Sequence, residues 1–309
     1  MITVYSPATI GNISVGFDTL GLAISPIDNS YFGDIVIIKK CKTFKLKNIG
    51  KFSKKLPKIL EKNVVWKCWK YFCKKINKKV PMSIILKKNM PIGSGLGSSA
   101  CSISASLFAM NEFCKNPLSK NELLILMGKL EGKISGNIHF DNVAPCFLGG
   151  LQIILQKNNI ISQSIPFFQN WIWVIAWPGT KISTLQSRKI LPKKYNKQTC
   201  IDHSRNLAGF IHASYSMQEN LAIKFLKDKI AEPYRIKIIP KFLKTKKIIK
   251  KIGAIGFGIS GSGPTIFSIC NSIKIAKNVS IWLSKNYLKN KKGFVKICKV
   301  NNTGTIKIR

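Results

Sequence analysis

The sequence is poor in acidic side chains, arginine and histidine. Its 309 residues contain 12 Asp and Glu and 3 His against 51 Lys and Arg, which gives a formal net charge of +39. Only positions 188, 205, 235 and 309 are Arg, so nearly all of the positive charge is lysine. Nucleic-acid binders usually gather base-reading Arg and stacking aromatics on one element, and the sequence has no such cluster. We therefore expect a compositional background of lysine and no specific nucleic-acid partner.

The sequence also lacks C-x-x-C pairs and Cys/His groups with the spacing of zinc ligands. Its 9 Cys are an odd number, mostly in apolar runs, which favours reduced, buried thiols in a cytoplasmic protein. The first residues show no basic segment with a cleavage-like site. The uncharged stretches 158–180 and 252–273 are too polar to provide the ~20 mostly apolar residues of a spanning helix. We expect a cytoplasmic protein with no membrane partner.

Hydrophobic residues make up 45% of the chain, enough for a buried core, and the length suggests about two domains. Alternating apolar residues predict strands, and apolar residues at i, i+3, i+4 and i+7 predict helices. The predicted strands are 2–5, 34–38, 81–87, 151–155, 171–176, 264–269 and 294–300. The predicted helices are 63–75, 100–113, 119–132, 183–191, 200–215, 218–229, 240–251 and 276–286. This mixture favours an α+β fold class, with domains 1–160 and 161–309 divided at a predicted loop, 157–164.

The most informative motif is a glycine-rich loop between a predicted strand and a predicted helix. Glycines let the backbone turn tightly and approach a ligand, and consecutive N–H groups can form an anion-binding nest. The following helix start adds the positive end of a dipole. The loop therefore predicts phosphate binding, although it fits neither the P-loop nor the Rossmann fingerprint; a flexible turn before a packed helix is the alternative. Its residues are Pro91, Ile92, Gly93, Ser94, Gly95, Leu96, Gly97, Ser98, Ser99, Ala100 and Cys101.

A second glycine cluster, at 256–261, formally matches G-x-G-x-x-G. The segment after it is a predicted strand, whereas the dinucleotide fingerprint must open a helix. A dinucleotide site is therefore rejected. Two interpretations stay open for this cluster: a turn between strands, or a Gly/Ser loop that closes over a bound ligand.

Three segments, in this order, resemble the GHMP kinase family of small-molecule kinases: Ser6-Pro-Ala, the loop 91–100, and Gly258-Ile-Ser-Gly-Ser-Gly-Pro-Thr. Segments 12–21, 139–145, 183–192 and 232–235 are similar to the enterobacterial type of the branch that phosphorylates homoserine. The resemblance covers almost the whole chain. It implies an N-terminal domain like the second domain of ribosomal protein S5 and a ferredoxin-like C-terminal domain. It also implies ATP-dependent phosphorylation of L-homoserine to O-phospho-L-homoserine, on the route to threonine.

The same resemblance implies that ATP lies over the loop 91–101 and that Mg²⁺ is held by Ser99 and Glu131. Mg²⁺ prefers oxygen ligands. A carboxylate near the end of a predicted helix opposes the helix dipole, so Glu131 is a better functional candidate than most surface acids. Arg188 and Arg235 are predicted to bind the substrate carboxylate, because arginine presents a planar fork and lysine does not. A structural ion pair is the alternative for each arginine.

The remaining predicted substrate contacts are Asp18 for the ammonium group, Asn12 and Asn142 for the hydroxyl, and His139 as a lining residue. In mevalonate kinases an Asp is the proposed base, and its place here is filled by Asn142, with Asp141 one residue earlier. An amide cannot accept a proton as a base. We therefore expect the hydroxyl proton to pass directly to the γ-phosphate while Asn142 and Arg188 supply orientation and charge, with Asp141 as base the alternative.

Two rival functions stay open on the sequence alone. One is another small-molecule kinase of the same family, such as a mevalonate kinase. The other is a non-catalytic basic binding protein on the same fold, which would bind with a steep salt dependence and not turn over ATP. The sequence leaves both a monomer and a homodimer open.

Overall fold

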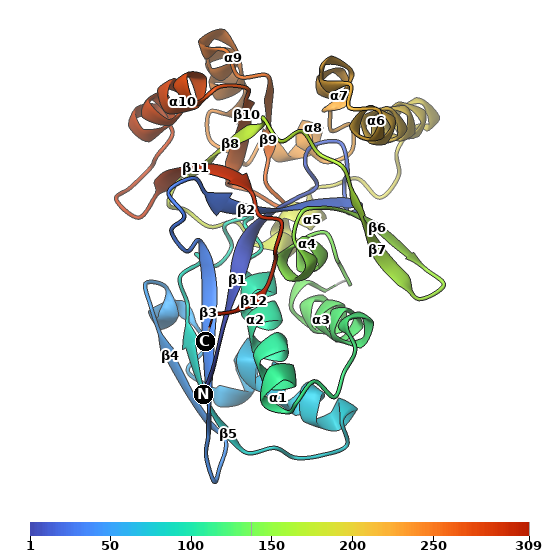
Figure 1. The fold of residues 1–309 in the computed structure, drawn as a ribbon. Helices are drawn as coiled ribbons and strands as arrows, with labels where there is room; N and C mark the ends of the chain where they lie inside the picture. The colour runs from blue at the N-terminus through green and yellow to red at the C-terminus, as the bar shows by residue number, and fades with distance from the viewer. Residues whose placement is uncertain (137, 309) are drawn as a thin grey trace.

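The computed structural model describes residues 1–136 and 138–308. Figure 1 shows α1, α2 and α3 at one end of the molecule, and α6, α7, α9 and α10 at the other. The strands are β1 Ile2–Gly11, β2 Leu20–Pro26, β3 Gly33–Lys40, β4 Lys45–Ile49, β5 Met82–Lys87, β6 Leu151–Lys157, β7 Ile160–Ile165, β8 Ile172–Trp177, β9 Gly256–Ile259, β10 Ile266–Cys270, β11 Phe294–Val300 and β12 Ile306–Lys307. The α-helices are α1 Val64–Lys75, α2 Ser98–Phe113, α3 Lys120–Ser135, α4 Val143–Leu148, α5 Thr184–Lys189, α6 Lys197–Tyr215, α7 Glu219–Phe225, α8 Glu232–Arg235, α9 Phe242–Ile252 and α10 Ile273–Asn286.

The strands join into one sheet in the order β4-β5-β3-β1-β2-β11-β8-β10-β9, with β6 beside β2, β7 beside β6 and β12 beside β1. Of the described pairs, β4 and β5 run parallel and the others antiparallel. The long strand β1 pairs with β3 through its first residues and with β2 through 8–11. It therefore joins the two parts of the sheet, and its far end delivers the loop 12–18.

The central helix α2 contacts β1, β3, α1 and α3. Its sequence is dominated by Ala and Ser, with Leu107 and Met110 among the larger buried residues. Small side chains allow the helix to lie close to the sheet on one side and to its neighbours on the other, so it is buried almost all round. This fixes the start of α2, at Ser98, deep inside the molecule.

A second, smaller core lies between β8, β9 and β10 and the helices α9 and α10. Phe242, Thr245 and Ile249 are the buried positions of α9. Their spacing of three and four residues gives one buried face, while Lys244, Lys247, Lys250 and Lys251 are exposed. This core supports the strand β9 and the Gly/Ser segment that follows it.

The chain returns to its first half at its end. Strand β11 lies between β2 and β8, and β12 pairs with β1. Residues 294–307 are therefore part of the same sheet as the first strands. The division into domains 1–160 and 161–309 stays a prediction, and residue 160 falls within the β6–β7 hairpin.

The predicted α+β class is confirmed, and most predicted elements are present. Several boundaries were wrong. The helix expected over 218–229 ends at Phe225, and the strand expected over 2–5 continues to Gly11. The segment 157–164, expected to be a loop, is mostly the hairpin of β6 and β7. The helix expected to end near residue 132 continues to Ser135 and is capped by Gly136. Glu131 is therefore one turn inside α3 and not at its end, which removes the argument from the helix dipole.

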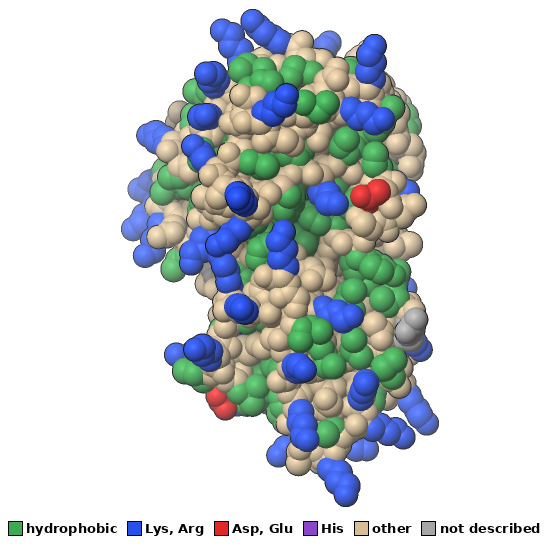
Figure 2. All heavy atoms as spheres, turned by 90° about the vertical axis from the view of Figure 1, so that its left-hand side faces the viewer, with side chains coloured by type: hydrophobic (Ala, Val, Ile, Leu, Met, Phe, Trp, Pro, Cys, Tyr) green, Lys and Arg blue, Asp and Glu red, His purple; other side chains and the backbone are tan. Residues whose placement is uncertain are grey.

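Basic side chains are spread over the whole face shown in Figure 2, where acidic side chains are sparse. This distribution is the one expected from a lysine-rich composition. The absence of a specific nucleic-acid partner stays a prediction. Among the described residues, no helix combines the length and the apolar character needed to cross a membrane.

Candidate active site

Two of the sequence motifs, the glycine loop and the late Gly/Ser segment, lie against each other. The loop follows β5 and leads into α2. The Ser260 hydroxyl donates to the Gly95 carbonyl at 2.6 Å, and the backbone N–H of Thr265 donates to the Ser94 carbonyl at 3.2 Å. The late glycine segment joins the antiparallel strands β9 and β10, so it is a turn between strands, and it packs against the glycine loop. Its closure over a bound ligand stays a prediction.

Glycine is required where the loop enters α2. Gly97 has a φ of +63°, in the left-handed region where glycine carries no steric penalty. A Cβ atom there would lie 2.0 Å from the Thr9 hydroxyl and 3.2 Å from the Asn142 side-chain oxygen. The end of the loop is thus pressed against β1 and against the start of α4, so the predicted nucleotide and substrate regions are adjacent.

A buried ion pair between Lys88 and Asp34 fixes both ends of the glycine loop. The Lys88 ammonium donates to the Asp34 carboxylate at 2.5 Å and to the Ser98 carbonyl at 2.6 Å. The other Asp34 oxygen accepts from the backbone N–H groups of Asn89 and Met90. Both charged side chains are at most 2% exposed. The pair therefore ties β3 to both ends of the glycine loop.

The two predicted metal ligands lie together. The Ser99 hydroxyl, in the first turn of α2, donates to the Glu131 carboxylate on α3 at 2.5 Å. Burial raises the pKa of Glu131, while the Ser99 hydrogen bond and Lys88 lower it. The arrangement presents a carboxylate and a hydroxyl oxygen beside the glycine loop.

Asn142, one of the two residues predicted to bind the hydroxyl, forms a second group with Thr9 and Asp141. Asn142 accepts a hydrogen bond from the Thr9 hydroxyl at 2.8 Å and donates to the Asp141 carboxylate at 3.1 Å. Asp141 is 5% exposed. Burial, together with Asp18, raises its pKa to about 7, although Arg188 lowers it. This carboxyl is therefore partly protonated at neutral pH.

The residues predicted for the substrate ammonium and carboxylate also converge. Arg188, from α5, donates to the Asp18 carboxylate at 2.6 Å and lies 3.1 Å from Nδ1 of His139. Burial lowers the pKa of His139, and Arg188 lowers it further, against Asp18. Because a guanidinium N–H can only donate, Nδ1 of His139 is the acceptor in its contact with Arg188.

Arg235 reaches the same region from α8. It is 3% exposed and donates to the Gly261 carbonyl at 2.8 Å, to which the Asn12 amide also donates at 3.4 Å. Asn12 in turn accepts from the backbone N–H of Asp18 at 3.0 Å. All predicted substrate residues are therefore brought to one region, between the loop 12–18, α4, α5 and α8.

Sequence reasoning missed several residues that support this region. Thr9, Asp34 and Lys88 had no signal beyond a polar residue in an apolar strand pattern, and Lys88 was hidden by the abundance of lysine. Asp228 accepts from the backbone N–H groups of three successive residues, 230–232, at 2.8–2.9 Å. It fixes the entry into α8 and hence the position of Arg235.

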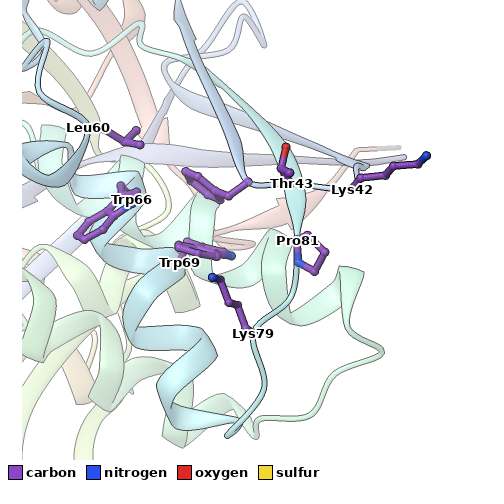
Figure 3. A pocket seen from close by; sticks show the side chains of 8 residues that line it. Lys42, Thr43, Leu60, Trp66, Trp69, Lys79 and Pro81 are labelled. Atoms are coloured by element: carbon purple, nitrogen blue, oxygen red, sulfur yellow. The ribbon is translucent and has the colours of Figure 1, made fainter.

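A separate surface pocket of about 460 Å³ lies between the start of β4, α1 and the start of β5. Figure 3 shows Trp66 and Trp69 on α1, with Thr43 and Pro81 to their right. None of its lining residues is among those predicted to bind nucleotide, metal or substrate. The pocket is therefore distinct from the residues described above.

The raised pKa of Asp141 predicts a pH-dependent stability. An Asp ionises near pH 3.8 in the unfolded chain and near pH 7 in the folded protein. This difference contributes stability to the folded protein that is fully present below the pKa of the unfolded chain. The stability is lost as the pH rises through the pKa of the folded protein, because the unfolded chain releases the proton first. Asp141→Asn removes this group, so we expect the variant to lose less stability than wild type across this window. Urea unfolding at several pH values measures it, and parallel pH profiles would contradict it.

The chain matches two family models. The model described as "GHMP kinases N terminal domain" matches residues 63–150, and "GHMP kinases C terminal" matches residues 203–285. A homoserine kinase of Buchnera aphidicola subsp. Acyrthosiphon pisum is 62% identical over 308 residues, covering 100% of both chains. One from Buchnera aphidicola subsp. Cinara cedri is 59% identical, covering 100% of this chain and 98% of the relative. The crystal structure of homoserine kinase from Cytophaga hutchinsonii is similar with a TM-score of 0.89 and 31% identity, covering 99% and 97% of the two chains.

Proposed function

The chain belongs to the GHMP kinase family, and on that premise we propose that it transfers the γ-phosphoryl group of ATP to the hydroxyl of L-homoserine, forming O-phospho-L-homoserine. The single observation that carries the substrate assignment is the convergence of Arg188, Arg235 and Asp18 beside the glycine loop. Two guanidinium groups and a carboxylate complement the carboxylate and ammonium of an amino acid. The relatives named above, which match over the full length, support the same substrate.

The glycine loop is proposed to bind the ATP phosphates. Its glycines at 93, 95 and 97 all have positive φ, which turns successive N–H groups toward one side of the loop and makes an anion-binding nest. The loop opens α2, whose first N–H groups lack partners within the helix and attract negative charge. Because Ser260 and Thr265 hold the loop in place, little ordering remains to be done when nucleotide binds.

Ser99 and Glu131 are proposed to hold Mg²⁺. Their oxygen atoms suit this ion: a carboxylate oxygen and a hydroxyl oxygen lie 2.5 Å apart on half-buried residues beside the glycine loop. Mg²⁺ commonly takes one or two protein oxygens and completes its coordination with phosphates and water. When bound, the ion would neutralise charge on the transferring phosphate.

For the chemical step we propose that the site orients the hydroxyl and neutralises charge, without a protein base. The hydroxyl oxygen forms the new bond to the γ-phosphorus, the bond to the bridging oxygen breaks, and the hydroxyl proton passes to a γ-phosphate oxygen. Asn142, fixed by Thr9 and Asp141, orients the hydroxyl. Asp141 as base is the alternative, and its pKa of about 7 suits such a role. Turnover by Asp141→Asn above pH 7 separates the two mechanisms. Retained turnover would favour the mechanism without a protein base, and its loss would favour Asp141 as base.

An ATP-consumption assay with homoserine, mevalonate, serine and threonine tests the proposed function. We expect turnover with homoserine to exceed that with the other three by a wide margin, because only homoserine combines an amino acid head with a hydroxyl at this distance. A preference for mevalonate would favour the rival kinase function. Nucleic-acid binding with a steep salt dependence and no turnover of ATP would favour the non-catalytic one.

Arg235→Lys is expected to weaken homoserine binding while leaving ATP binding almost unchanged. The substitution keeps the charge and loses the planar fork, which costs on the order of 1.5–3 kcal/mol. The dissociation constant for homoserine should therefore rise roughly ten- to a hundredfold. Calorimetric titration with homoserine and with the amino alcohol that lacks its carboxylate measures the effect.

The matched control for this prediction is Arg205→Lys, at an exposed position on α6. It should leave both titrations unchanged. If Arg235→Lys weakens the binding of homoserine and of the amino alcohol equally, Arg235 supports the fold and does not bind the carboxylate.

A further inference from the structure

Phe17 lies between the two arginines of the proposed substrate site. The guanidinium carbon of Arg188 is 5.6 Å from the centroid of the Phe17 ring, and that of Arg235 is 5.4 Å from the same centroid. Both distances fall within the range in which the electron-rich face of an aromatic ring attracts a cation. One half-buried ring therefore serves two cations from different elements, α5 and α8.

The two guanidinium groups repel each other, and each has one N–H group without a partner among the described residues. Burial lowers the pKa of Arg235, and the charge of Arg188 lowers it further, against Asp228, Asp18 and Asp141. Within the described residues, the Nε–H groups of both arginines are buried and have no hydrogen-bond acceptor. Like charges held close together and partly unsatisfied will move apart unless other contacts hold them.

The backbone around Phe17 holds the ring in a fixed place. Asn12, Ile13 and Ser14 all have φ between +46° and +73°, a left-handed conformation that costs energy in residues other than glycine and persists only under tertiary constraint. Two contacts provide this constraint. The Asn12 side chain accepts a hydrogen bond from the N–H of Asp18. The Ser14 hydroxyl lies so close to Gly258 that a Cβ atom on Gly258 would be 2.2 Å from it. The loop is thus locked against β9.

We propose that Phe17 is a specificity-determining residue, whose ring sets the spacing and orientation of Arg188 and Arg235 so that both face one carboxylate. This inference rests on the proposed function, since it takes the carboxylate of homoserine as the group that lies between the arginines. The ring contributes through its negative face and does not contact the reacting atoms. Asp18, the next residue, pairs with Arg188, so the loop supplies both a ring and an anion to the pair of cations.

The experiment compares three replacements at position 17. Phe17→Leu keeps an apolar side chain and removes the ring face. Phe17→Tyr keeps the face. A ring-fluorinated phenylalanine keeps the ring and weakens its negative face. Steady-state kinetics give KM for homoserine and for ATP, and kcat, while thermal unfolding reports whether each variant is folded.

We expect Phe17→Leu to raise KM for homoserine about tenfold, with KM for ATP within about twofold of wild type. Phe17→Tyr should stay near wild type, and the fluorinated residue should fall between wild type and Leu. The amino alcohol that lacks the carboxylate should show no trend, because it does not use the arginine pair. If Phe17→Leu does not fold, the fluorinated residue still decides the matter.

Two results would overturn the inference: a fluorinated variant with the wild-type KM for homoserine, or equal rises of KM for homoserine and ATP in Phe17→Leu. The proposed function is tested separately, by wild-type turnover. If the wild type phosphorylates homoserine but the variants at position 17 leave KM for homoserine unchanged, only the role of Phe17 is rejected. A wild type that does not phosphorylate homoserine rejects the function itself.

Discussion

Replacing Glu131 with Gln should lower kcat by roughly a hundred- to a thousandfold, because the loss of a carboxylate beside the transferring phosphate removes several kcal/mol of transition-state stabilisation. The amide keeps the size of the side chain and can still bond to the Ser99 hydroxyl, which lies 2.5 Å from the carboxylate in the wild-type protein. The fold should therefore be retained. KM for homoserine should change little, since Glu131 does not contact the arginine pair. A titration of turnover with Mg²⁺ measures the effect.

Glu122→Gln provides the matched control. It lies on the same helix, removes the same charge, and is the Glu of the capping box with Ser119, a position where Gln also caps. We expect wild-type turnover from it. Equal turnover of the two variants at every Mg²⁺ concentration would reject Glu131 as a metal ligand.

The second large effect concerns stability. Lys88→Met should lower the free energy of unfolding by about 3–5 kcal/mol, the cost of leaving one partner of a buried ion pair alone. The carboxylate of Asp34 is fully buried and would keep its backbone donors at 89 and 90 but lose its counter-charge. The start of the glycine loop should loosen with it, so KM for ATP should rise in the folded fraction.

Lys87→Met, on the neighbouring half-buried lysine of β5, makes the same chemical change without breaking the pair. Denaturant unfolding of both variants measures the difference. The double variant Asp34→Asn with Lys88→Met should recover part of the loss, because both charges are then gone. If Lys88→Met costs no more than Lys87→Met, the pair does not stabilise the loop.

Much of the fold could be predicted because periodicity reports burial directly. Strand β5 alternates buried and half-buried residues, and α1 buries Val65, Cys68 and Phe72 at helical spacing. Helix α2 is buried almost all round, and its Ala, Ser, Leu and Met content indicated a buried helix. Strand β4 was missed. Its sequence, Lys-Leu-Lys-Asn-Ile, alternates but is short and largely polar, and it is held by parallel pairing with β5. Such pairing depends on a partner far along the chain and leaves little local signal.

The residues of the candidate site also fall into those that the sequence could predict and those that it could not. Residue type and motif identified Arg188, Arg235, Asp18 and Asn142 as candidates, because their chemistry matches a substrate and phosphate. The residues that hold them could not be found in this way. Asp228 acts through backbone N–H groups, and Phe17 through its ring face. An acid in a loop or an apolar residue beside glycine is common in any sequence, so only the tertiary structure distinguishes these two.

The pairing of the last strands with the first has a consequence for how the chain is made. Strands β1 and β2 are synthesised first, yet their partners β12 and β11 are synthesised last. Until then β1 and β2 each lack a neighbour, and an unpaired strand edge is a template for association with other chains. We infer that the nascent chain is prone to association through these two strands until its last residues are synthesised.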